Sequence, residues 1–309
     1  MQTMWALLCK GRMPAYRRER WDTPDGDFID VDWATRQAGT PLVVLFHGLE
    51  GSSRSHYARA LMRAVAAAGW SGAVVHFRGC SGTPNRLARA YHSGDAAEID
   101  WILQRFRSLW PDAPRFAAGV SLGGNALLCW LGAQGAQAGA VISAAAAVCA
   151  PLDLALCGRA LERGFARVYT RHFLRSLKPR ALAKLQRWPG SVNAAAVHKA
   201  RTLYEFDDAV TAPLHGYHGA QDYWTRASAK HVLGQIALPT LILHARNDPF
   251  VPLRSLPAPE QLPANVTLEV TAEGGHVGFV SSPFPGRLDW MPQRLLEFFA
   301  QPEISRAKN

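Results

Sequence analysis

Short, uninterrupted apolar segments alternate with helical patterns through much of this chain, and this alternation constrains the fold more than any other feature. Four such segments in the first half are rich in small and β-branched residues (41–46, 73–77, 115–120 and 140–150). Runs of this kind are typical of strands that are buried on both faces of a sheet. Because helical spacing separates the runs, we expect an α/β fold with a mostly parallel, doubly wound sheet and right-handed crossovers.

Both ends of the chain extend this pattern. Further strands are predicted at 239–245 and 266–270, and an amphipathic helix at 290–299. Near the start, alternating residues predict a half-buried strand over 28–33, with residues 17–21 as its antiparallel hairpin partner. We therefore expect an N-terminal antiparallel hairpin beside the parallel strands.

The pattern changes between residues 154 and 235. This stretch has helical spacing and no run typical of a buried strand. We interpret it as a helical cap inserted into one α/β domain that spans residues 1–309. The core of that domain would comprise about 16–153 and 236–300.

The sequence Gly-Val-Ser-Leu-Gly at 119–123 matches the G-x-S-x-G pattern and places Ser121 between a predicted strand and a predicted helix. A serine on so sharp a turn has a strained backbone, and its neighbours must be small. The turn exposes the hydroxyl at the edge of the sheet, close to the N-terminus of the helix. Ser121 is therefore the candidate nucleophile.

A serine hydroxyl needs a base, and the base needs a third group to orient it. Asp248 and His276 follow the last two predicted strands, in the chain order serine, acid, histidine. We predict Asp248 as the orienting acid and His276 as the general base. Asp153, after the strand at 140–150, is the alternative acid. His244 lies inside a predicted strand and is expected to pack in the core.

The loop after the first parallel strand is the expected partner of the nucleophile turn. One oxyanion donor in such folds is the N–H of the residue after the nucleophile, and the other comes from this loop. Leu122 and Leu49 are the candidate donors. We expect His47 to brace the loop, and Cys80 to belong to a glycine-rich loop that borders the pocket, without a catalytic role.

Three motifs give the chain a family resemblance. They are HGLEGSSRSHY at 47–57, FRGCSG at 77–82 and GVSLGGN at 119–125. With these motifs the chain resembles the YheT-like branch of the α/β-hydrolase superfamily, from about Tyr16 to the final helix. The resemblance implies a triad of Ser121, Asp248 and His276. It also implies an esterase or lipase-like enzyme that acts on short- to medium-chain esters or acylglycerol-like lipids.

These residues predict a serine hydrolase that works through an acyl-enzyme intermediate and needs no metal or organic cofactor. Two alternatives stay open. The same triad supports an acyltransferase, in which an alcohol or thiol replaces water. A non-catalytic lipid-binding protein can also keep this fold.

Most of the net charge of +10 lies in the predicted cap, where residues 154–235 hold thirteen Lys and Arg residues against five acids. Five arginines recur every four residues (Arg159, Arg163, Arg167, Arg171 and Arg175). On one helix they would form a slowly drifting stripe, with Leu161, Phe165, Val168 and Tyr169 facing the core or pocket. We interpret the stripe as a solvated face. The alternative is transient contact with an anionic membrane surface or an acidic substrate. No nucleic-acid motif accompanies the charge.

The sequence also bears on the compartment. No run approaches the roughly 18 apolar residues of a membrane span. The apolar patch in the first ten residues lacks the positive flank of a signal peptide. The five cysteines (Cys9, Cys80, Cys129, Cys149 and Cys157) include no CxxC pair, which favours neither a disulfide framework nor a zinc site. We expect a cytoplasmic protein, with peripheral membrane contact as an option.

Overall fold

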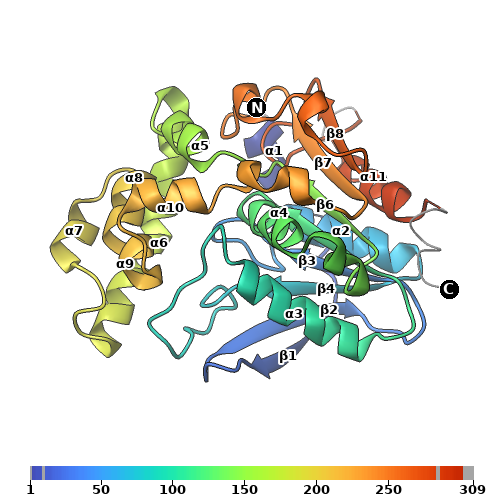
Figure 1. The fold of residues 1–309 in the computed structure, drawn as a ribbon, viewed down its shortest axis with the longest axis horizontal. Coiled ribbons are helices and arrows are strands. Elements are labelled where there is room, and N and C mark those ends of the chain that lie inside the picture. The colour runs from blue at the N-terminus through green and yellow to red at the C-terminus, as the bar shows by residue number, and fades with distance from the viewer. Residues whose placement is uncertain (1, 9–10, 283–285, 302–309) are drawn as a thin grey trace.

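The computed structural model describes residues 2–8, 11–282 and 286–301, and within them eight strands form one sheet (Figure 1). The strand order is β1-β2-β4-β3-β5-β6-β7-β8. The strands are β1 Arg17–Asp22, β2 Phe28–Thr35, β3 Leu42–Phe46, β4 Ser71–His76, β5 Arg115–Val120, β6 Ala144–Val148, β7 Thr240–Ala245 and β8 Val266–Thr271. Strands β3 to β8 run parallel, whereas β2 is antiparallel to β1 and β4. The predicted fold class is therefore confirmed.

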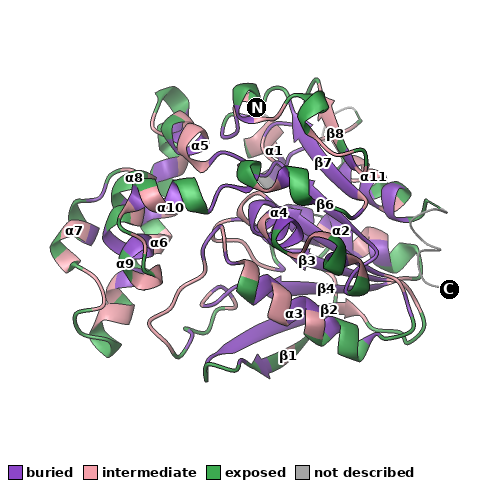
Figure 2. Ribbon diagram, viewed as in Figure 1, coloured by how far each residue is buried: buried purple, intermediate pink, exposed green. Residues whose placement is uncertain are grey.

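Helices cover both faces of this sheet, and Figure 2 shows buried strands between them. They are α2 His56–Ala67 and α11 Trp290–Phe299 on one face, and α3 Ala96–Leu109 and α4 Leu122–Gln134 on the other. Successive residues of β3 alternate between the layers, so that Val43 packs with α2 and α11 while Val44 packs with α3 and α4. This two-sided burial explains the uninterrupted apolar runs of the parallel strands.

The hairpin forms as predicted, but β2 is not half-buried. Residues 28–33 are all buried, including Asp30 and Asp32. Arg20 Nε lies 2.8 Å from Asp30 Oδ1, and Arg18 Nε lies 2.7 Å from Asp32 Oδ1. Arg18 and Arg20 each form a second hydrogen bond to the same carboxylate. Because both carboxylates are paired, they can lie on a buried face that the alternating pattern assigned to solvent.

Between β6 and β7, all secondary-structure elements of the described chain are helices. These elements are α5 Leu154–Leu161, η2 Gly164–Ala166, α6 Arg167–Arg187, α7 Ala194–Lys199, α8 Leu203–Phe206, η3 Asp207–Thr211, α9 Ala212–His215, α10 Ala220–Arg226, η4 Ala229–His231 and η5 Leu233–Gln235. They lie to one side of the sheet in Figure 1, apart from η4 and η5, which pack against α4. Among the residues that the structure describes, no helix combines the length and apolarity needed to cross a bilayer.

The arginine series does not lie on one helix. Arg159 is on α5, Arg163 precedes η2, and only the later three arginines share α6. Gly164, with φ 51°, separates the two helices. A glycine adopts this left-handed conformation at little cost. The chain can therefore turn at Gly164, between the end of α5 and the start of α6, although the arginine spacing continues across the turn.

Two apolar residues beside the arginines also depart from expectation. Phe165 is 69% exposed and Val168 is 47% exposed, although both were predicted to face the core or pocket. Leu161 and Tyr169 do line cavities. Phe165 lies on the short η2 helix that follows the break at Gly164, where it does not continue the face of α5.

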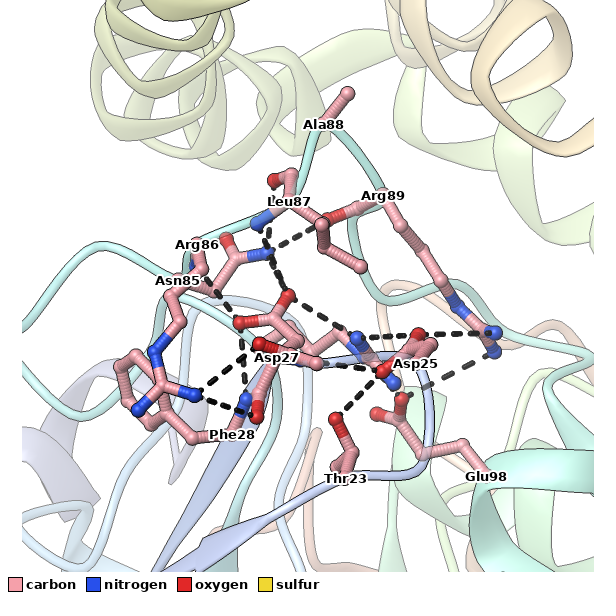
Figure 3. Close-up of polar contacts among 12 residues, drawn as sticks. Thr23, Asp25, Asp27, Phe28, Asn85, Arg86, Leu87, Ala88, Arg89 and Glu98 are labelled. Atoms are coloured by element: carbon pink, nitrogen blue, oxygen red, sulfur yellow. Dashed lines mark hydrogen bonds and ion pairs between the residues drawn. The ribbon is translucent and has the colours of Figure 1, made fainter.

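The carboxylate of Asp27, in the turn between β1 and β2, organises the loop that follows β4 (Figure 3). It accepts hydrogen bonds from the backbone N–H of Phe28 and Arg86, at 2.9 and 2.7 Å, and from Asn85 Nδ2 at 2.6 Å. Arg78 Nη1 lies 3.0 Å from the same carboxylate. A buried acid with this many donors fixes the path of residues 78–89 beside the sheet.

Helix α6 is attached to the same loop. Lys184 Nζ donates to the carbonyl oxygens of Leu87, Ala88 and Arg89, at 3.3, 3.1 and 2.5 Å. Arg187 Nη1 donates to the carbonyl oxygen of Asn85 at 3.1 Å. The second half of α6 is thus held against the core by backbone acceptors.

Candidate active site

Ser121 lies on the turn between β5 and α4, with φ 52° and ψ −120°. This conformation is strained for a residue with a β-carbon. The turn is also tight: a β-carbon on Gly119 would lie 2.5 Å from the carbonyl oxygen of Gly123, and one on Gly123 would lie 2.5 Å from that of His47. The glycines of the motif are therefore required by the close approach of backbone to backbone.

Asp248 follows β7, and its side chain is completely buried. One carboxylate oxygen accepts hydrogen bonds from the backbone N–H of Phe250 and Val251, at 2.8 and 3.2 Å. Burial opposes ionisation, but the electrostatic interaction and hydrogen bond with His276, together with these backbone hydrogen bonds, outweigh it and lower the pKa of Asp248 below its ordinary value. The acid is held ionised and in one orientation.

His276 follows β8 and contacts both other residues. Its Nδ1 lies 2.8 Å from Asp248 Oδ2, and its Nε2 lies 3.0 Å from Ser121 Oγ. A carboxylate can only accept, so Nδ1 carries the proton and Nε2 is free to accept the hydrogen of the serine hydroxyl. The ring of Phe250 packs on the imidazole with 4.3 Å between centroids. The structure thus brings together the three residues predicted from chain order.

The N-terminal helix α1 (Gln2–Leu8) also contacts this site, which the sequence analysis missed. Thr3 Oγ1 accepts a hydrogen bond of 2.8 Å from the backbone N–H of His276. A β-carbon on Gly275 would lie 2.7 Å from Thr3 Oγ1, so a glycine is needed for the helix to approach. No motif signals this contact, and the apolar character of residues 4–8 is its only trace in the sequence.

The loop after β3 passes directly beside the serine. A β-carbon on Gly48 would lie 3.1 Å from the β-carbon of Ser121. Tyr57 Oη accepts the N–H of Gly48 at 2.9 Å, which holds the loop in place. Within the described chain, the N–H groups of Leu49 and Leu122 have no hydrogen-bond acceptor. Both residues line the cavity that contains Ser121, so their N–H groups are available to an incoming oxygen.

His47 braces this loop, as expected. It is fully buried, its Nδ1 lies 2.8 Å from the carbonyl oxygen of Gly48, and its Nε2 accepts the N–H of Phe77 at 3.2 Å. Burial lowers the pKa of His47 to about 3. A neutral imidazole that already has a partner on each nitrogen has a structural role.

The other candidates have different environments. Asp153 accepts the N–H of Leu156 as the N-cap of α5 and binds Lys230 Nζ at 2.5 Å. His244 is fully buried in β7, where burial lowers its pKa to about 4. Cys80 is buried beside Arg180, and burial raises the pKa of its thiol to about 12. A thiol with this pKa is protonated near neutral pH and is a poor nucleophile.

One group of possible metal ligands occurs among the described residues, and it coincides with the site. Cys149 Sγ, a carboxylate oxygen of Asp248 and a ring nitrogen of His276 all lie within 4.8 Å of one another. However, His276 Nδ1 is already bonded to Asp248, and burial raises the pKa of the Cys149 thiol well above its ordinary value. Ligands in this protonation state do not suit a cation.

An apolar cavity of about 140 Å³ extends from Ser121 under the helices between β6 and β7. Its apolar lining comes mostly from those helices and includes Leu154, Leu161, Phe173, Leu203, Phe206 and Trp224. Asp207 is a polar exception, and it accepts hydrogen bonds from Thr211 Oγ1 and Trp224 Nε1. Burial raises the pKa of Asp207 to about 6, against the effect of these bonds.

The sheet order, the strained serine turn and an acid and a histidine after successive strands define an α/β-hydrolase. The family model described as the alpha/beta hydrolase fold matches residues 41–283, and the chain belongs to this family. The protein YheT of Escherichia coli (strain K12) is 44% identical over 282 residues, which cover 90% of this chain and 82% of YheT. The phospholipase ABHD3 of Mus musculus is 31% identical over 309 residues, covering 96% and 74%. The predicted resemblance is confirmed.

Solved structures agree on the fold. The esterase Pf2001 of Pyrococcus furiosus matches with a TM-score of 0.59 at 17% identity, over 92% of this chain and 91% of that one. Est1E of Butyrivibrio proteoclasticus matches with a TM-score of 0.59 at 14% identity, over 95% and 100%. At such identities the likeness concerns the fold alone.

Proposed function

We propose that this protein is a serine hydrolase that cleaves carboxylic esters through an acyl-enzyme intermediate. The observation that carries the proposal is the chain of contacts from Asp248 through His276 to Ser121, at 2.8 and 3.0 Å, beside an apolar cavity. A nucleophile, its base and an orienting acid in hydrogen-bond contact constitute the machinery of acyl transfer.

In the first step, Nε2 of His276 takes the proton of Ser121 Oγ while Oγ forms a bond to the ester carbonyl carbon. The carbonyl electron pair moves to its oxygen, which would lie between the N–H groups of Leu49 and Leu122. Asp248 stays ionised and stabilises the imidazolium through Nδ1. The intermediate then collapses, its bond to the alcohol oxygen breaks, and that oxygen receives the proton from Nε2.

In the second step, water replaces the alcohol. Nε2 removes a proton from water while the water oxygen adds to the acyl carbon. Collapse of this second intermediate expels Ser121 Oγ, which recovers its proton from His276 and releases the acid. An acceptor alcohol or thiol in place of water would give an acyltransferase with the same residues, and added acceptor alcohols distinguish the two by their products.

The cavity supports an apolar acyl group as the part of the substrate next to Ser121. Its walls are hydrophobic apart from a few polar groups, as in other small-molecule sites. We propose short- to medium-chain esters or acylglycerol-like lipids as substrates. The names of two relatives support a lipid: the phospholipase ABHD3 of Mus musculus, and a monoacylglycerol lipase of Saccharomyces cerevisiae that is 28% identical over 274 residues.

The position of the cavity supports the proposed division of the chain. Residues 154–235 supply most of its apolar wall, while Ser121, Asp248 and His276 come from 16–153 and 236–300. We therefore propose a catalytic core and a helical cap that determines which acyl group fits. Substitutions in the cap would then change substrate preference more than the chemistry.

The test is labelling with a fluorophosphonate, followed by rates on p-nitrophenyl esters of increasing chain length. We expect the label on Ser121 and a rate maximum at one chain length. Ser121→Ala should lose both the label and turnover while keeping its circular dichroism spectrum. Undiminished turnover by Ser121→Ala would exclude this nucleophile. A wild-type protein that neither labels nor turns over would favour the alternative, a non-catalytic lipid-binding protein of the same fold.

A further inference from the structure

Five exposed arginines and two exposed apolar side chains occupy the end of the cap where α5 passes into α6. This surface, which we call the arginine patch, comprises Arg159, Arg163, Phe165, Arg167, Val168, Arg171 and Arg175. Figure 2 shows exposed residues along this end of the cap. Phe165 is the most exposed large apolar side chain of the described chain, at 69%. Exposed apolar side chains that are rimmed by charged residues can mark a surface of interaction.

The arginines of the patch have no carboxylate partners, whereas several other arginines of the described chain are paired. Within the described residues, none of the five forms an ion pair. The ion pairs of the cap instead involve Arg180, Arg226 and Lys230. On β1, Arg18 and Arg20 are each paired with a buried aspartate. Residues 159–175 contain one acid, Glu162, against these five arginines, so the segment keeps a net positive charge that is available to an anionic partner.

The patch adjoins the opening of the active site. Tyr169, His172 and Phe173 of α6 line a cleft that also contains Ser121 and His276. Aromatic rings connect the exposed surface with the catalytic base: ring centroids lie 6.0 Å apart from Phe165 to Tyr169, 4.6 Å from Tyr169 to Phe250 and 4.3 Å from Phe250 to His276. An acyl chain that leaves a lipid layer near Phe165 could therefore follow aromatic side chains as far as His276.

We propose that the arginine patch docks the enzyme on an anionic lipid surface, with Phe165 and Val168 inserted among the headgroups and the cleft opening toward the lipid. Unpaired arginines complement the charge of anionic headgroups, and each basic residue near such a surface contributes about 1 kcal/mol of attraction. Exposed aromatic and aliphatic side chains add the apolar contact that interfacial helices use. The patch is formed by the end of α5, by η2 and by the first half of α6, and all of its side chains are exposed.

The charge is tested with vesicles of phosphatidylcholine, with and without phosphatidylglycerol, in a flotation assay. We expect the wild-type protein to bind the anionic vesicles, and to bind them less at high salt because exposed charges are screened. The double variant Arg167→Gln/Arg171→Gln should bind roughly 30-fold more weakly, since each arginine contributes about fivefold. Lys199→Gln/Arg201→Gln is the matched control, because it removes the same charge from exposed positions elsewhere in the cap and should bind like the wild type.

The apolar contact is tested separately at high salt, where electrostatic attraction is weak. Phe165→Ser should lower binding roughly tenfold through the loss of apolar burial. Leu109→Ser, at a position that is 38% exposed on α3, should have no effect. Failure of the wild-type protein to bind either vesicle would overturn the proposal and would favour an acidic protein as the partner. Equal binding by Arg167→Gln/Arg171→Gln and the wild type would also overturn it.

Docking and catalysis can fail independently. Flotation is therefore repeated in the Ser121→Ala background, where binding should equal that of the wild type. The patch variants should hydrolyse soluble p-nitrophenyl esters at the wild-type rate, since none of the substituted residues lines the cavity or the cleft. Vesicle binding without ester turnover would support the docking proposal and contradict the proposed hydrolase. Ester turnover without vesicle binding would support the hydrolase and contradict the docking proposal.

Discussion

The backbone N–H of His276 donates a hydrogen bond of 2.8 Å to the hydroxyl of Thr3, a residue 273 positions earlier in the chain. This bond fixes the loop between β8 and α11 at the residue that carries the proposed base. Thr3→Val keeps the shape of the side chain and removes the acceptor. Loss of one such bond costs about 1 kcal/mol, so we expect kcat to fall roughly fivefold with KM little changed.

Thr3→Ser is the matched control, because it keeps the hydroxyl and should retain the wild-type kcat. Burst kinetics with a p-nitrophenyl ester would show whether the acylation rate is the one affected. A Thr3→Val enzyme with the same kcat as Thr3→Ser would mean that the N-terminal helix has no influence on His276.

The two candidate acids can be separated by substitution with asparagine. Asp248→Asn presents an amide to His276 Nδ1 and favours the wrong tautomer, so kcat should fall by roughly 10⁴-fold. Asp153→Asn removes the pairing with Lys230 and weakens the cap of α5, which should affect stability more than kcat. The measurement is kcat for both variants at several pH values. A large loss of kcat in Asp153→Asn alone would reverse the assignment of the acid.

The proposed oxyanion donor, the N–H of Leu49, is tested by removing its hydrogen. Leu49→Pro deletes the N–H, and the preceding Gly48 has no β-carbon to clash with the proline ring. Loss of one such donor costs roughly 10²- to 10³-fold in kcat. Leu49→Ala keeps the N–H and is expected to stay within a few-fold of the wild type. If the two variants have similar kcat values, the second donor is another group.

The close packing of the turn at Ser121 predicts a stability effect. Gly123→Ala would place its β-carbon 2.5 Å from the carbonyl oxygen of His47 and 2.6 Å from that of Phe46, and backbone atoms cannot move aside easily. We expect the free energy of unfolding to fall by roughly 1 to 3 kcal/mol, and kcat to fall as well. At Gly139 the nearest atom is 3.9 Å away, so Gly139→Ala should be close to neutral. Urea denaturation of both variants provides the comparison.

Asp207 predicts a pH dependence of stability. Burial raises its pKa in the folded protein to about 6, whereas an unfolded aspartate has a pKa of about 4. Between these values the folded state holds a proton that the unfolded state has released. The free energy of unfolding should therefore decrease as pH rises from about 4 to about 6, by up to roughly 3 kcal/mol from this residue. Asp207→Asn should lack this part of the dependence, and parallel stability curves for the two proteins would contradict it.

The elements around the site could be predicted because each depends on a local pattern. Strands buried on both faces leave uninterrupted apolar runs, and the parallel topology then places residues such as Asp248 and His276 at the same edge of the sheet. The turn at Ser121 could be recognised because only glycine tolerates its close backbone contacts. These requirements appear in the sequence as residue types at fixed positions.

Other features depend on partners that are distant in sequence. In the sequence pattern Asp30 and Asp32 are typical of solvent-facing residues. Their burial depends on ion pairs with Arg20 and Arg18 of β1, which the pattern does not reveal. The contact of Thr3 with His276 uses a backbone N–H, which leaves no mark on residue type. The turn at Gly164 interrupts an arginine spacing that suits a helix on either side of it, so the spacing alone could not locate the break.

The attachment of α6 to the core has a consequence for how this protein can evolve. Lys184 and Arg187 bind carbonyl oxygens of residues 85–89, which every amino acid supplies. Mutations that change the side chains of Leu87, Ala88 or Arg89 therefore leave the acceptors for these two cations in place. Substitutions in the cavity wall formed by residues 154–235, or on the surface of this loop, therefore leave the hydrogen bonds between α6 and the loop in place.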